Sequence, residues 1–263
     1  MHRFADKVVL VTGGSSGIGQ AVARRIAAER GTVVIAARRK DVGEEAAAGL
    51  RARGAEAMFV AADITREKDV SQLVETVVRT YGHLDAAFNN AGLQSLSGPV
   101  GAISESAWRE VIDTNLTGTF LSLKHEIPAL LGSGGGAVLN NASSLSVVGA
   151  PEVAPYAAAK HGVIGLTRSA ALECAARGIR VNALVTGTTN AGLIKRLRES
   201  AAQASGTAGN SAEDEEDVAG AFCPLGRLAR PAEIAAFAAF LLSDEASFIT
   251  GAALAIDGGA TAD

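Results

Sequence analysis

Short runs of β-branched and aliphatic residues alternate with longer amphipathic stretches along this chain of 263 residues. The apolar runs are continuous, which is typical of parallel strands that are buried on both faces. We expect strands at Lys7–Thr12, Thr32–Ala37, Ala55–Ala61, Leu84–Asn89, Gly136–Asn141, Ile179–Leu184 and Ala252–Ile256. Helices are expected at Gly17–Arg30, Val42–Arg53, Lys68–Tyr81, Glu105–Leu131, Val153–Ala176 and Ala232–Leu242. This order predicts one α/β domain over residues 1–263, a doubly wound parallel sheet of about seven strands with helices on both faces.

Composition excludes several classes of protein. Hydrophobic residues make up 48% of the chain, so a disordered protein is excluded. The net charge of −4 argues against a nucleic-acid partner, which favours a basic surface. Cys174 and Cys223 are too few for a disulfide framework and lack metal-ligand spacing, so no metal site is expected. No apolar run reaches the ~20 residues that span a bilayer, and no signal peptide is evident. We therefore expect a cytoplasmic protein with no membrane partner.

One segment interrupts the alternation of strands and helices. Residues Thr186–Phe222 are rich in Thr, Ser, Gly and Ala and contain the acidic run Glu213–Asp217. Long loops in compact domains usually serve as lids or binding loops. We expect residues 186–222 to form a substrate-binding loop or lid within the domain, with the acidic run on its solvated surface.

The first strand runs directly into a glycine-rich turn and then a helix. The glycines Gly13, Gly17 and Gly19 have the spacing G-x-x-x-G-x-G. Such a turn lets backbone N–H groups approach a pyrophosphate at a helix N-terminus. No Gly-Lys-Ser/Thr follows, so a nucleoside-triphosphate loop is disfavoured. Because the turn joins a strand to a helix at the start of a doubly wound pattern, we interpret it as a dinucleotide site rather than a structural turn.

The end of the second strand indicates which dinucleotide is preferred. NAD sites usually place an acid there to bind the ribose 2′-hydroxyl. This chain has Ala37 at that position, followed by Arg38, Arg39 and Lys40. A guanidinium group offers two parallel donors to a 2′-phosphate. NADP(H) is therefore favoured over NAD(H), although a solvated basic helix start is the alternative interpretation.

Tyr156 and Lys160 are four residues apart in a predicted helix, so their side chains share one face. A free tyrosine has a pKa near 10 and is a poor acid or base at neutral pH. An ammonium group ~4 Å away, at an effective dielectric constant of ~20, supplies about 4 kcal/mol. That energy is enough to bring the pKa of a phenol to ~7. By itself, however, a Tyr-x-x-x-Lys pair is more often surface packing.

Three further polar positions have both a functional and a structural interpretation. Ser143 and Ser144 follow the fifth strand, at the carboxyl edge where doubly wound folds bind ligands, and a hydroxyl there can hold a carbonyl oxygen. Asn115 lies in a predicted helix, and its alternative role is a satisfied buried amide. Asn89–Gly92 ends the fourth strand, where a simple turn is the alternative.

Taken together, these residues resemble the short-chain dehydrogenase/reductase family, in its simple form of about 250 residues. The resemblance covers nearly the whole chain and depends on the order and spacing of many motifs. They are Thr12–Gly19, Asp63-Ile64, Asn89–Gly92, Asn115, Ser143, Tyr156, Lys160, Arg180–Ala183, Pro224–Arg227 and Asp257–Gly259. The resemblance implies a Rossmann-like fold and a catalytic tetrad of Asn115, Ser143, Tyr156 and Lys160.

The resemblance also implies a role for each member of the tetrad. Tyr156 would exchange the proton with the substrate oxygen, and Ser143 would orient that oxygen. Lys160 would lower the pKa of Tyr156 and bind the nicotinamide ribose, while Asn115 would hold a water for proton relay. The family usually has its serine thirteen residues before the tyrosine, which selects Ser143 and leaves Ser144 as the alternative.

For the cofactor, the resemblance implies contacts along the whole carboxyl edge of the sheet. The implied residues, besides Tyr156 and Lys160, are Gly13, Ser15, Ser16, Gly17, Ile18, Gly19, Arg38, Arg39, Asp63, Ile64, Asn90, Ala91, Gly92, Gly187 and Thr189. One motif departs from the family pattern, because Thr186 stands where Pro usually precedes Gly187. We expect Thr188 or Thr189 to take over the contact with the nicotinamide carboxamide.

These features predict an NADP(H)-dependent oxidoreductase that interconverts a small carbonyl compound and an alcohol. A non-catalytic NADP(H)-binding sensor or scaffold on the same fold is the main alternative, and an extended-type epimerase or dehydratase is a weaker one. Specificity should reside in residues 93–99, 146–155 and 186–222, and a partly apolar pocket is suggested by Leu145, Val147, Val148, Leu193 and Phe222.

The resemblance implies a homotetramer, with a homodimer as the alternative. The helices at 105–131 and 153–176 would form one interface, with Ala170, Ala171 and Cys174 allowing close approach. The alternative is that this face of the helix packs on the sheet.

Overall fold

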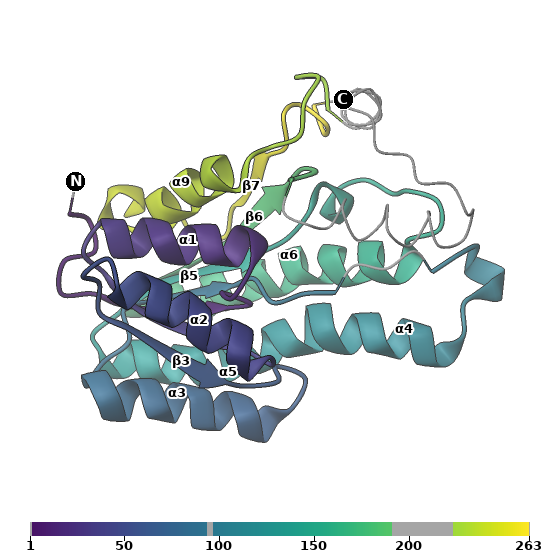
Figure 1. The fold of residues 1–263 in the computed structure, drawn as a ribbon. Coiled ribbons are helices and arrows are strands. Elements are labelled where there is room, and N and C mark those ends of the chain that lie inside the picture. The colour runs from purple at the N-terminus through teal and green to yellow at the C-terminus, as the bar shows by residue number, and fades with distance from the viewer. Residues whose placement is uncertain (1, 94–96, 191–222, 263) are drawn as a thin grey trace.

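A computed structural model describes residues 2–93, 97–190 and 223–262 of the chain. Its centre is a seven-stranded parallel sheet with the order β3-β2-β1-β4-β5-β6-β7 (Figure 1). The strands are β1 (Val8–Thr12), β2 (Thr32–Ala37), β3 (Ala57–Ala61), β4 (Ala86–Asn89), β5 (Gly136–Asn141), β6 (Ile179–Thr186) and β7 (Ala253–Ile256). The doubly wound α/β fold and all seven predicted strands are thus confirmed.

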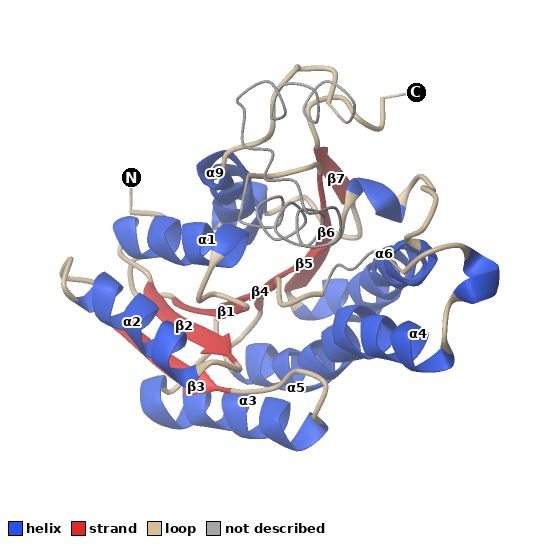
Figure 2. Cartoon of the chain, turned by 45° about the vertical axis from the view of Figure 1, so that its right-hand side comes forward, coloured by secondary structure: helices blue, strands red, loops and turns tan. Residues whose placement is uncertain are grey.

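Helices cover both faces of the sheet (Figure 2). They are α1 (Gly17–Ala28), α2 (Lys40–Arg51), α3 (Glu67–Tyr81), α4 (Glu105–Ile112), α5 (Gly118–Gly132), α6 (Ala154–Cys174) and α9 (Pro231–Leu242). Helices α1, α2 and α9 pack on one face, and α3, α5 and α6 pack on the other. Within the described ranges, no helix is both long and apolar enough to cross a membrane.

Alternation along the strands divides the core into two layers. In β1, Val9 and Val11 face α1 and α9, whereas Val8 and Leu10 face α3, α5 and α6. The small side chains of α6 belong to the second layer, where they pack against the sheet; they are Ala170, Ala171 and Cys174. The prediction that these three residues lie at a subunit interface is therefore wrong, because the chain buries them itself.

Most element boundaries differ from the sequence prediction by one or two residues, and two differences bear on the site. The single helix expected at 105–131 is interrupted by a π-helical turn, Asp113–Thr117, between α4 and α5. Strand β6 continues past Leu184 to Thr186, which pairs with Ile256 of β7. The predicted loop therefore begins after Thr186, and residues 191–222, including its acidic run, lie outside the described residues.

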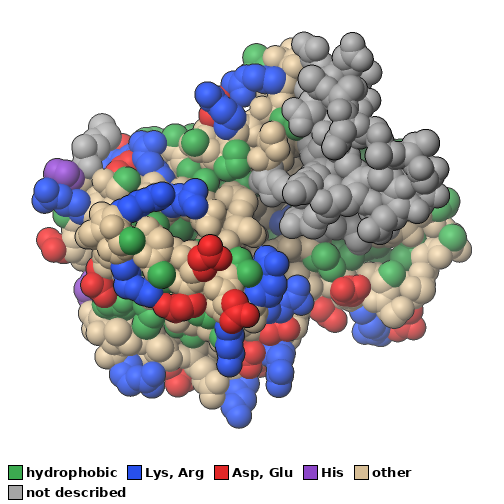
Figure 3. Space-filling view, in the orientation of Figure 1, with side chains coloured by type: hydrophobic (Ala, Val, Ile, Leu, Met, Phe, Trp, Pro, Cys, Tyr) green, Lys and Arg blue, Asp and Glu red, His purple; other side chains and the backbone are tan. Residues whose placement is uncertain are grey.

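Charges of both signs are interspersed on the surface that carries α1, α2 and α3 (Figure 3). The visible described face has no extended basic stripe of the kind that binds nucleic acid.

Candidate active site

A cleft of about 810 Å³ lies along the carboxyl edge of the sheet. The order of the strands places it at the point where the chain changes from one face of the sheet to the other, between β1 and β4. Ligands of open α/β sheets bind in this crevice, outside the carboxyl ends of the strands. The glycine-rich turn, the ends of β2, β4 and β5, and the start of α6 all contribute to the cleft.

The cleft brings together almost every residue that the sequence predicts for the site. Its lining includes the predicted residues Gly13, Ser15, Ser16, Gly17, Ile18, Arg38, Arg39, Asp63, Ile64, Asn90, Ala91, Gly92, Asn115, Ser143, Tyr156, Lys160, Gly187 and Thr189. Gly19 differs, because it packs beneath the turn rather than lining the cleft. A Cβ atom there would collide with the carbonyl oxygen of Gly13 and with the Asn90 amide.

The glycine-rich turn leaves donors available at the start of α1. Gly13 and Gly17 have φ values of 65° and 56°, which side chains rarely adopt. Ser16 precedes the helix without a side-chain capping bond, and the first turn contains no acidic residue. The first N–H groups of a helix lack partners and attract anions. The turn therefore fits a pyrophosphate group.

A layer of hydrogen bonds joins this turn to β4. The Thr12 hydroxyl accepts hydrogen bonds from the backbone N–H groups of Asn90 (3.0 Å) and Ala91 (3.2 Å). In return, Asn90 Nδ2 donates to the carbonyl oxygens of Thr12 (3.2 Å) and Gly13 (3.4 Å). Sequence reasoning assigned no role to Thr12. Its position at the end of β1, beside β4 in a parallel sheet, was the available signal.

The end of β2 presents two exposed cations to the cleft. Arg38 and Arg39 both line it, and neither has an ion-pair partner among the residues that the structure describes. On the far side of this part of the cleft, Asp63 Oδ1 accepts hydrogen bonds from the N–H and hydroxyl of Thr65 (3.0 and 2.9 Å). Ile64 is buried and packs against Leu121. This half of the cleft is positively charged at one edge and apolar at its base.

Tyr156 and Lys160 project from the first turns of α6, as predicted. The Lys160 ammonium lies 5.6 Å from the centroid of the Tyr156 ring and donates to the carbonyl oxygen of Asn141 at 2.5 Å. Burial lowers the pKa of Lys160 to about 8. Burial raises the pKa of Tyr156 above its usual value, and a hydrogen bond with Ser143 opposes this rise. Desolvation is therefore the largest influence on this phenol, and the lowering of its pKa by the Lys160 ammonium stays a prediction.

Ser143 is the serine next to the tyrosine. It lies two residues after β5 in an extended conformation, and its Oγ accepts a hydrogen bond from Leu145 N at 3.2 Å. The Ser146 hydroxyl accepts from Ser143 N (2.9 Å) and fixes the turn. Ser144 also lines the cleft, and it is Ser143 whose interaction with Tyr156 opposes the rise in the pKa of that phenol. The choice of Ser143 over Ser144 from sequence spacing stays a prediction.

Asn115 lies in the π-helical turn and uses its amide group within the chain. Its Nδ2 donates to the carbonyl oxygens of Leu93 (2.7 Å) and Val111 (3.0 Å), and its Oδ1 accepts from Leu93 N (3.2 Å). The side chain thereby holds the segment after β4 against α4. This is the structural interpretation of Asn115, and its role in proton relay stays a prediction.

The segment after β6 closes the nicotinamide end of the predicted site. Gly187 has no room for a side chain, because a Cβ atom would lie 2.6 Å from Asp257 Cα. Thr189 is buried, pairs with Ala229 and donates from its hydroxyl to the carbonyl oxygen of Gly187 (3.1 Å). The Thr186 hydroxyl donates to the carbonyl oxygen of Ala142 (3.3 Å), which ties β6 to β5 where the family has a proline.

Apolar side chains also line the cleft: Leu93, Leu145, Ala150, Pro151 and Val153. Leu145 was predicted for this pocket. Val147 and Val148 were also predicted, but they do not line it and are 49% and 41% exposed. Leu193 and Phe222 lie outside the described residues.

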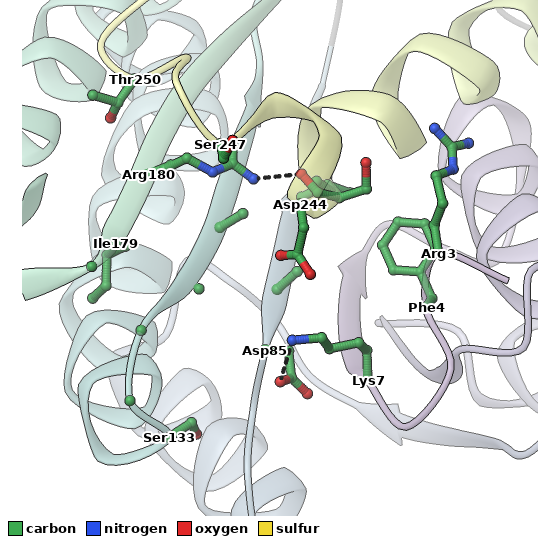
Figure 4. Close-up of a pocket in the computed structure, with 18 of the residues that line it drawn as sticks. Arg3, Phe4, Lys7, Asp85, Ser133, Ile179, Arg180, Asp244, Ser247 and Thr250 are labelled. Atoms are coloured by element: carbon green, nitrogen blue, oxygen red, sulfur yellow. Dashed lines mark hydrogen bonds and ion pairs between the residues drawn. The ribbon is translucent and has the colours of Figure 1, made fainter.

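A second concavity, of about 700 Å³, lies at the opposite edge of the sheet (Figure 4). Its cations are already engaged. Arg3 pairs with Glu29 and Glu245, and Lys7 pairs with Asp85. Arg180 donates to backbone carbonyl oxygens at the end of α9, as in its 2.9 Å bond to Ser243. These contacts are structural, so we place the active site at the carboxyl edge.

Comparison with known proteins gives one consistent result. A family model described as "Enoyl-(Acyl carrier protein) reductase" matches residues 13–261. The cyclohexanol dehydrogenase of Acinetobacter sp. (strain SE19) is 38% identical over 99% of this chain and 97% of its own. The cis-4-hydroxycyclohexanecarboxylate dehydrogenase of Sinomonas cyclohexanicum is 42% identical over 98% of each chain.

Solved structures agree with these matches. A variant of actinorhodin polyketide ketoreductase with NADPH superposes with a TM-score of 0.90, at 34% identity over 97% of each chain. Levodione reductase also gives a TM-score of 0.90, at 35% identity over 98% of this chain and 99% of its own. From its fold, its cleft and these relatives, the chain belongs to the short-chain dehydrogenase/reductase family of NAD(P)-binding oxidoreductases.

Proposed function

We propose that the protein is an NADP(H)-dependent oxidoreductase that interconverts a ketone or aldehyde and the corresponding alcohol. The observation that carries this proposal is the convergence of Ser143, Tyr156 and Lys160 in one cleft with the glycine-rich turn. An acid–base group thus lies beside a site that fits a dinucleotide. The named relatives act on hydroxyl or carbonyl compounds, which supports the same reaction class.

The proposed mechanism assigns one task to each side chain. A bound nicotinamide supplies or accepts the hydride. Ser143 donates a hydrogen bond to the substrate oxygen and holds it beside the Tyr156 hydroxyl. Tyr156 gives its proton to that oxygen in reduction and removes it in oxidation. Lys160, fixed by the Asn141 carbonyl, stabilises the phenolate that forms.

Because burial raises the pKa of Tyr156, the phenol holds its proton at neutral pH. The protonated form is the one that carbonyl reduction requires, and alcohol oxidation requires its loss. We therefore expect the oxidation rate to rise with pH and reduction to be favoured near neutrality.

Replacing the phenol tests the proposal directly. We expect Tyr156→Phe to lower kcat by about 10²- to 10⁴-fold, as for loss of a general acid, while NADPH binds as before. NADPH oxidation is followed by absorbance, and binding by NADPH fluorescence. Tyr81→Phe is the matched control, because Tyr81 is the only other tyrosine, does not line the cleft, and donates from the end of α3 to Glu56. Turnover near the wild-type rate in Tyr156→Phe contradicts the assignment.

The cofactor preference is tested at the end of β2. We expect Arg38→Ala to raise the KM for NADPH by about 10- to 100-fold, because a charged hydrogen bond contributes about 1.5–3 kcal/mol. The KM for NADH should change less than twofold. Lys40→Ala is the control, since Lys40 is an exposed cation that does not line the cleft. Equal effects of Arg38→Ala on both cofactors would exclude recognition of the 2′-phosphate.

For the substrate, we propose a secondary alcohol on an aliphatic ring and the matching cyclic ketone. The relatives named above act on cyclohexanol and on a hydroxycyclohexane, and small apolar side chains line this cleft. The test is a panel of cyclohexanone, 2-hexanone and an enoyl thioester, each with NADPH and NADH. Preference for the thioester points to reduction of a C=C bond. Binding of NADPH without turnover of any compound points to the sensor or scaffold.

We also propose a homotetramer, with a homodimer as the alternative. Leu172 on α6 is 85% exposed, and Phe120 on α5 is 47% exposed. Two large apolar side chains on neighbouring helices favour a protein partner over solvent. A second copy of the chain is the partner that the family resemblance suggests.

A further inference from the structure

A chain of buried polar side chains lies under the floor of the cleft, on the face of the sheet covered by α5 and α6. Asn89 Nδ2 donates to Glu126 Oε2 (2.8 Å) and to Asn140 Oδ1 (3.1 Å). Asn140 Nδ2 donates to the Thr167 hydroxyl (2.9 Å). None of the four residues is more than 4% exposed. The chain therefore connects α5, β4, β5 and α6 without solvent.

Two residues of this chain, Asn89 and Asn140, are adjacent in sequence to residues that line the cleft. Asn89 precedes Asn90, which holds the glycine-rich turn, and Asn140 precedes Asn141, whose carbonyl oxygen binds Lys160. Asn141 Nδ2 also donates to Asn90 Oδ1 at 3.0 Å. Two asparagine pairs thus connect the ends of β4 and β5. The Asn90–Asn141 pair lies at the cleft, and Glu126 binds the Asn89–Asn140 pair beneath it.

Thr167 completes the connection, because it lies seven residues after Lys160 on α6. Seven residues are two helical turns, so both side chains face the sheet. A shift at Thr167 would move the turn that carries Tyr156 and Lys160. The network therefore reaches both the cofactor half and the proton-transfer half of the cleft.

A carboxyl group at this position is costly to the fold. Burial raises the pKa of Glu126 to about 7, and the Asn89 amide offsets only part of this effect. Glu126 Oε1 and Asn89 Oδ1 have no hydrogen-bond partner within the described part of the chain. An apolar side chain would avoid this cost, as the neighbouring buried Leu123 and Leu130 do. An apolar side chain, however, could not accept the hydrogen bond from Asn89 Nδ2.

We propose that Glu126 is a positioning residue of the active site, which fixes Asn89 and, through Asn140 and Thr167, sets the spacing between the cofactor turn, the Asn141 carbonyl and Lys160. This inference rests on the proposed oxidoreductase function. It predicts that Glu126 affects the reaction without touching substrate or cofactor. It also predicts that only the hydrogen-bond acceptor is essential.

The test compares an isosteric variant with an apolar one. Glu126→Gln keeps an acceptor for Asn89, so we expect its kcat to stay within about twofold of wild type. Glu126→Leu removes the acceptor, and we expect kcat to fall by about 10- to 100-fold with the KM for the ketone changed less than twofold, since misplacement of reacting groups costs up to about 10²-fold. Ser122→Ala is the matched control, because Ser122 is buried one turn earlier and, among the described residues, its hydroxyl bonds only to Gly118 O of the same helix.

A variant at the other end of the network guards against misfolding of Glu126→Leu. Thr167→Val keeps the shape of the side chain and removes the acceptor for Asn140. We expect Thr167→Val to lower kcat by about 3- to 10-fold, and the double variant with Glu126→Leu to lose less than the product of the two single losses. If kcat of the double variant falls by the full product of the two single losses, Glu126 and Thr167 act independently, and the proposed connection between them is overturned.

Hydrogen exchange supplies a readout that does not depend on turnover. Peptides covering residues 89–92 and 140–143 should lose protection in Glu126→Leu and retain it in Glu126→Gln and Ser122→Ala. If the proposed reaction is wrong, this pattern still appears although no ketone is reduced. Unchanged kcat in Glu126→Leu, or equal loss in Glu126→Gln and Glu126→Leu, overturns the positioning role.

Discussion

Lys160 and Glu126 show how burial acts on a cation and on a carboxyl group. Burial disfavours the charged form of each, so the pKa of Lys160 falls to about 8 and that of Glu126 rises to about 7. The usual values are 10.5 and 4.5. The native state therefore binds fewer protons than the unfolded state between pH 8 and 10.5, and more between pH 4.5 and 7. Stability should rise with pH in the first interval and fall in the second.

The contribution of Glu126 can be isolated with Glu126→Gln. As pH rises through 4.5 to 7, wild type loses the stability associated with the protonated carboxyl group, and the variant has no such group to titrate. We expect the unfolding free energy of Glu126→Gln, relative to wild type, to increase by about 2.5 kcal/mol between pH 5 and pH 8, measured by urea denaturation at both pH values. Ser122→Ala should show a difference that does not depend on pH. If the difference in unfolding free energy between Glu126→Gln and wild type is the same at pH 5 and pH 8, Glu126 does not titrate in this range.

At the scale of elements, the interruption between α4 and α5 depends on one side chain. Asn115 provides the partners for Leu93 N, Leu93 O and Val111 O. In Asn115→Ala these backbone groups lose them, and each unsatisfied buried group costs about 1–3 kcal/mol. We expect the free energy of unfolding to fall by at least about 2 kcal/mol, measured by chemical denaturation.

Thr117→Ala is the control within the same π-helical turn. The Thr117 hydroxyl makes a long, exposed bond of 3.5 Å to Asp113, so its loss should change stability by less than about 0.5 kcal/mol. Equal effects of Asn115→Ala and Thr117→Ala would show that the amide does not stabilise the interruption.

This turn also shows where prediction from sequence ended. Continuous apolar runs predicted all seven strands, because strands buried on both faces have a local signal. The interruption at Asn115 has no such signal, since it depends on Leu93, which is 22 residues away in sequence. Motif spacing identified Tyr156 and Lys160 correctly as neighbours. It could not show that Lys160 binds the Asn141 carbonyl, or that Glu126 of α5 is buried, because both depend on tertiary packing.

At the scale of the molecule, the two edges of the sheet have different tasks. The carboxyl edge gathers the open glycine-rich turn, two cations and the Tyr156–Lys160 pair. At the amino edge, paired charges such as Arg3 with Glu29 tie the N-terminus to α1. The outward surface of α5 and α6 carries exposed apolar side chains instead of ligand groups. Subunits should therefore associate through the outward surface of α5 and α6 and leave the cleft accessible.

The proposed assembly is tested by mass in solution. Each chain has a mass of 26.6 kDa, and light scattering should give about four times that value for the wild type. We expect Leu172→Asp to reduce the mass to that of a dimer or monomer, because a carboxylate buried without a partner costs several kcal/mol per copy. Val100→Asp is the control, since Val100 is 73% exposed but lies in the short turn before α4, away from α6. A wild-type monomer, or a tetramer that persists in Leu172→Asp, would exclude this surface as the interface, and the exposed Phe248 beside β7 would be the next candidate.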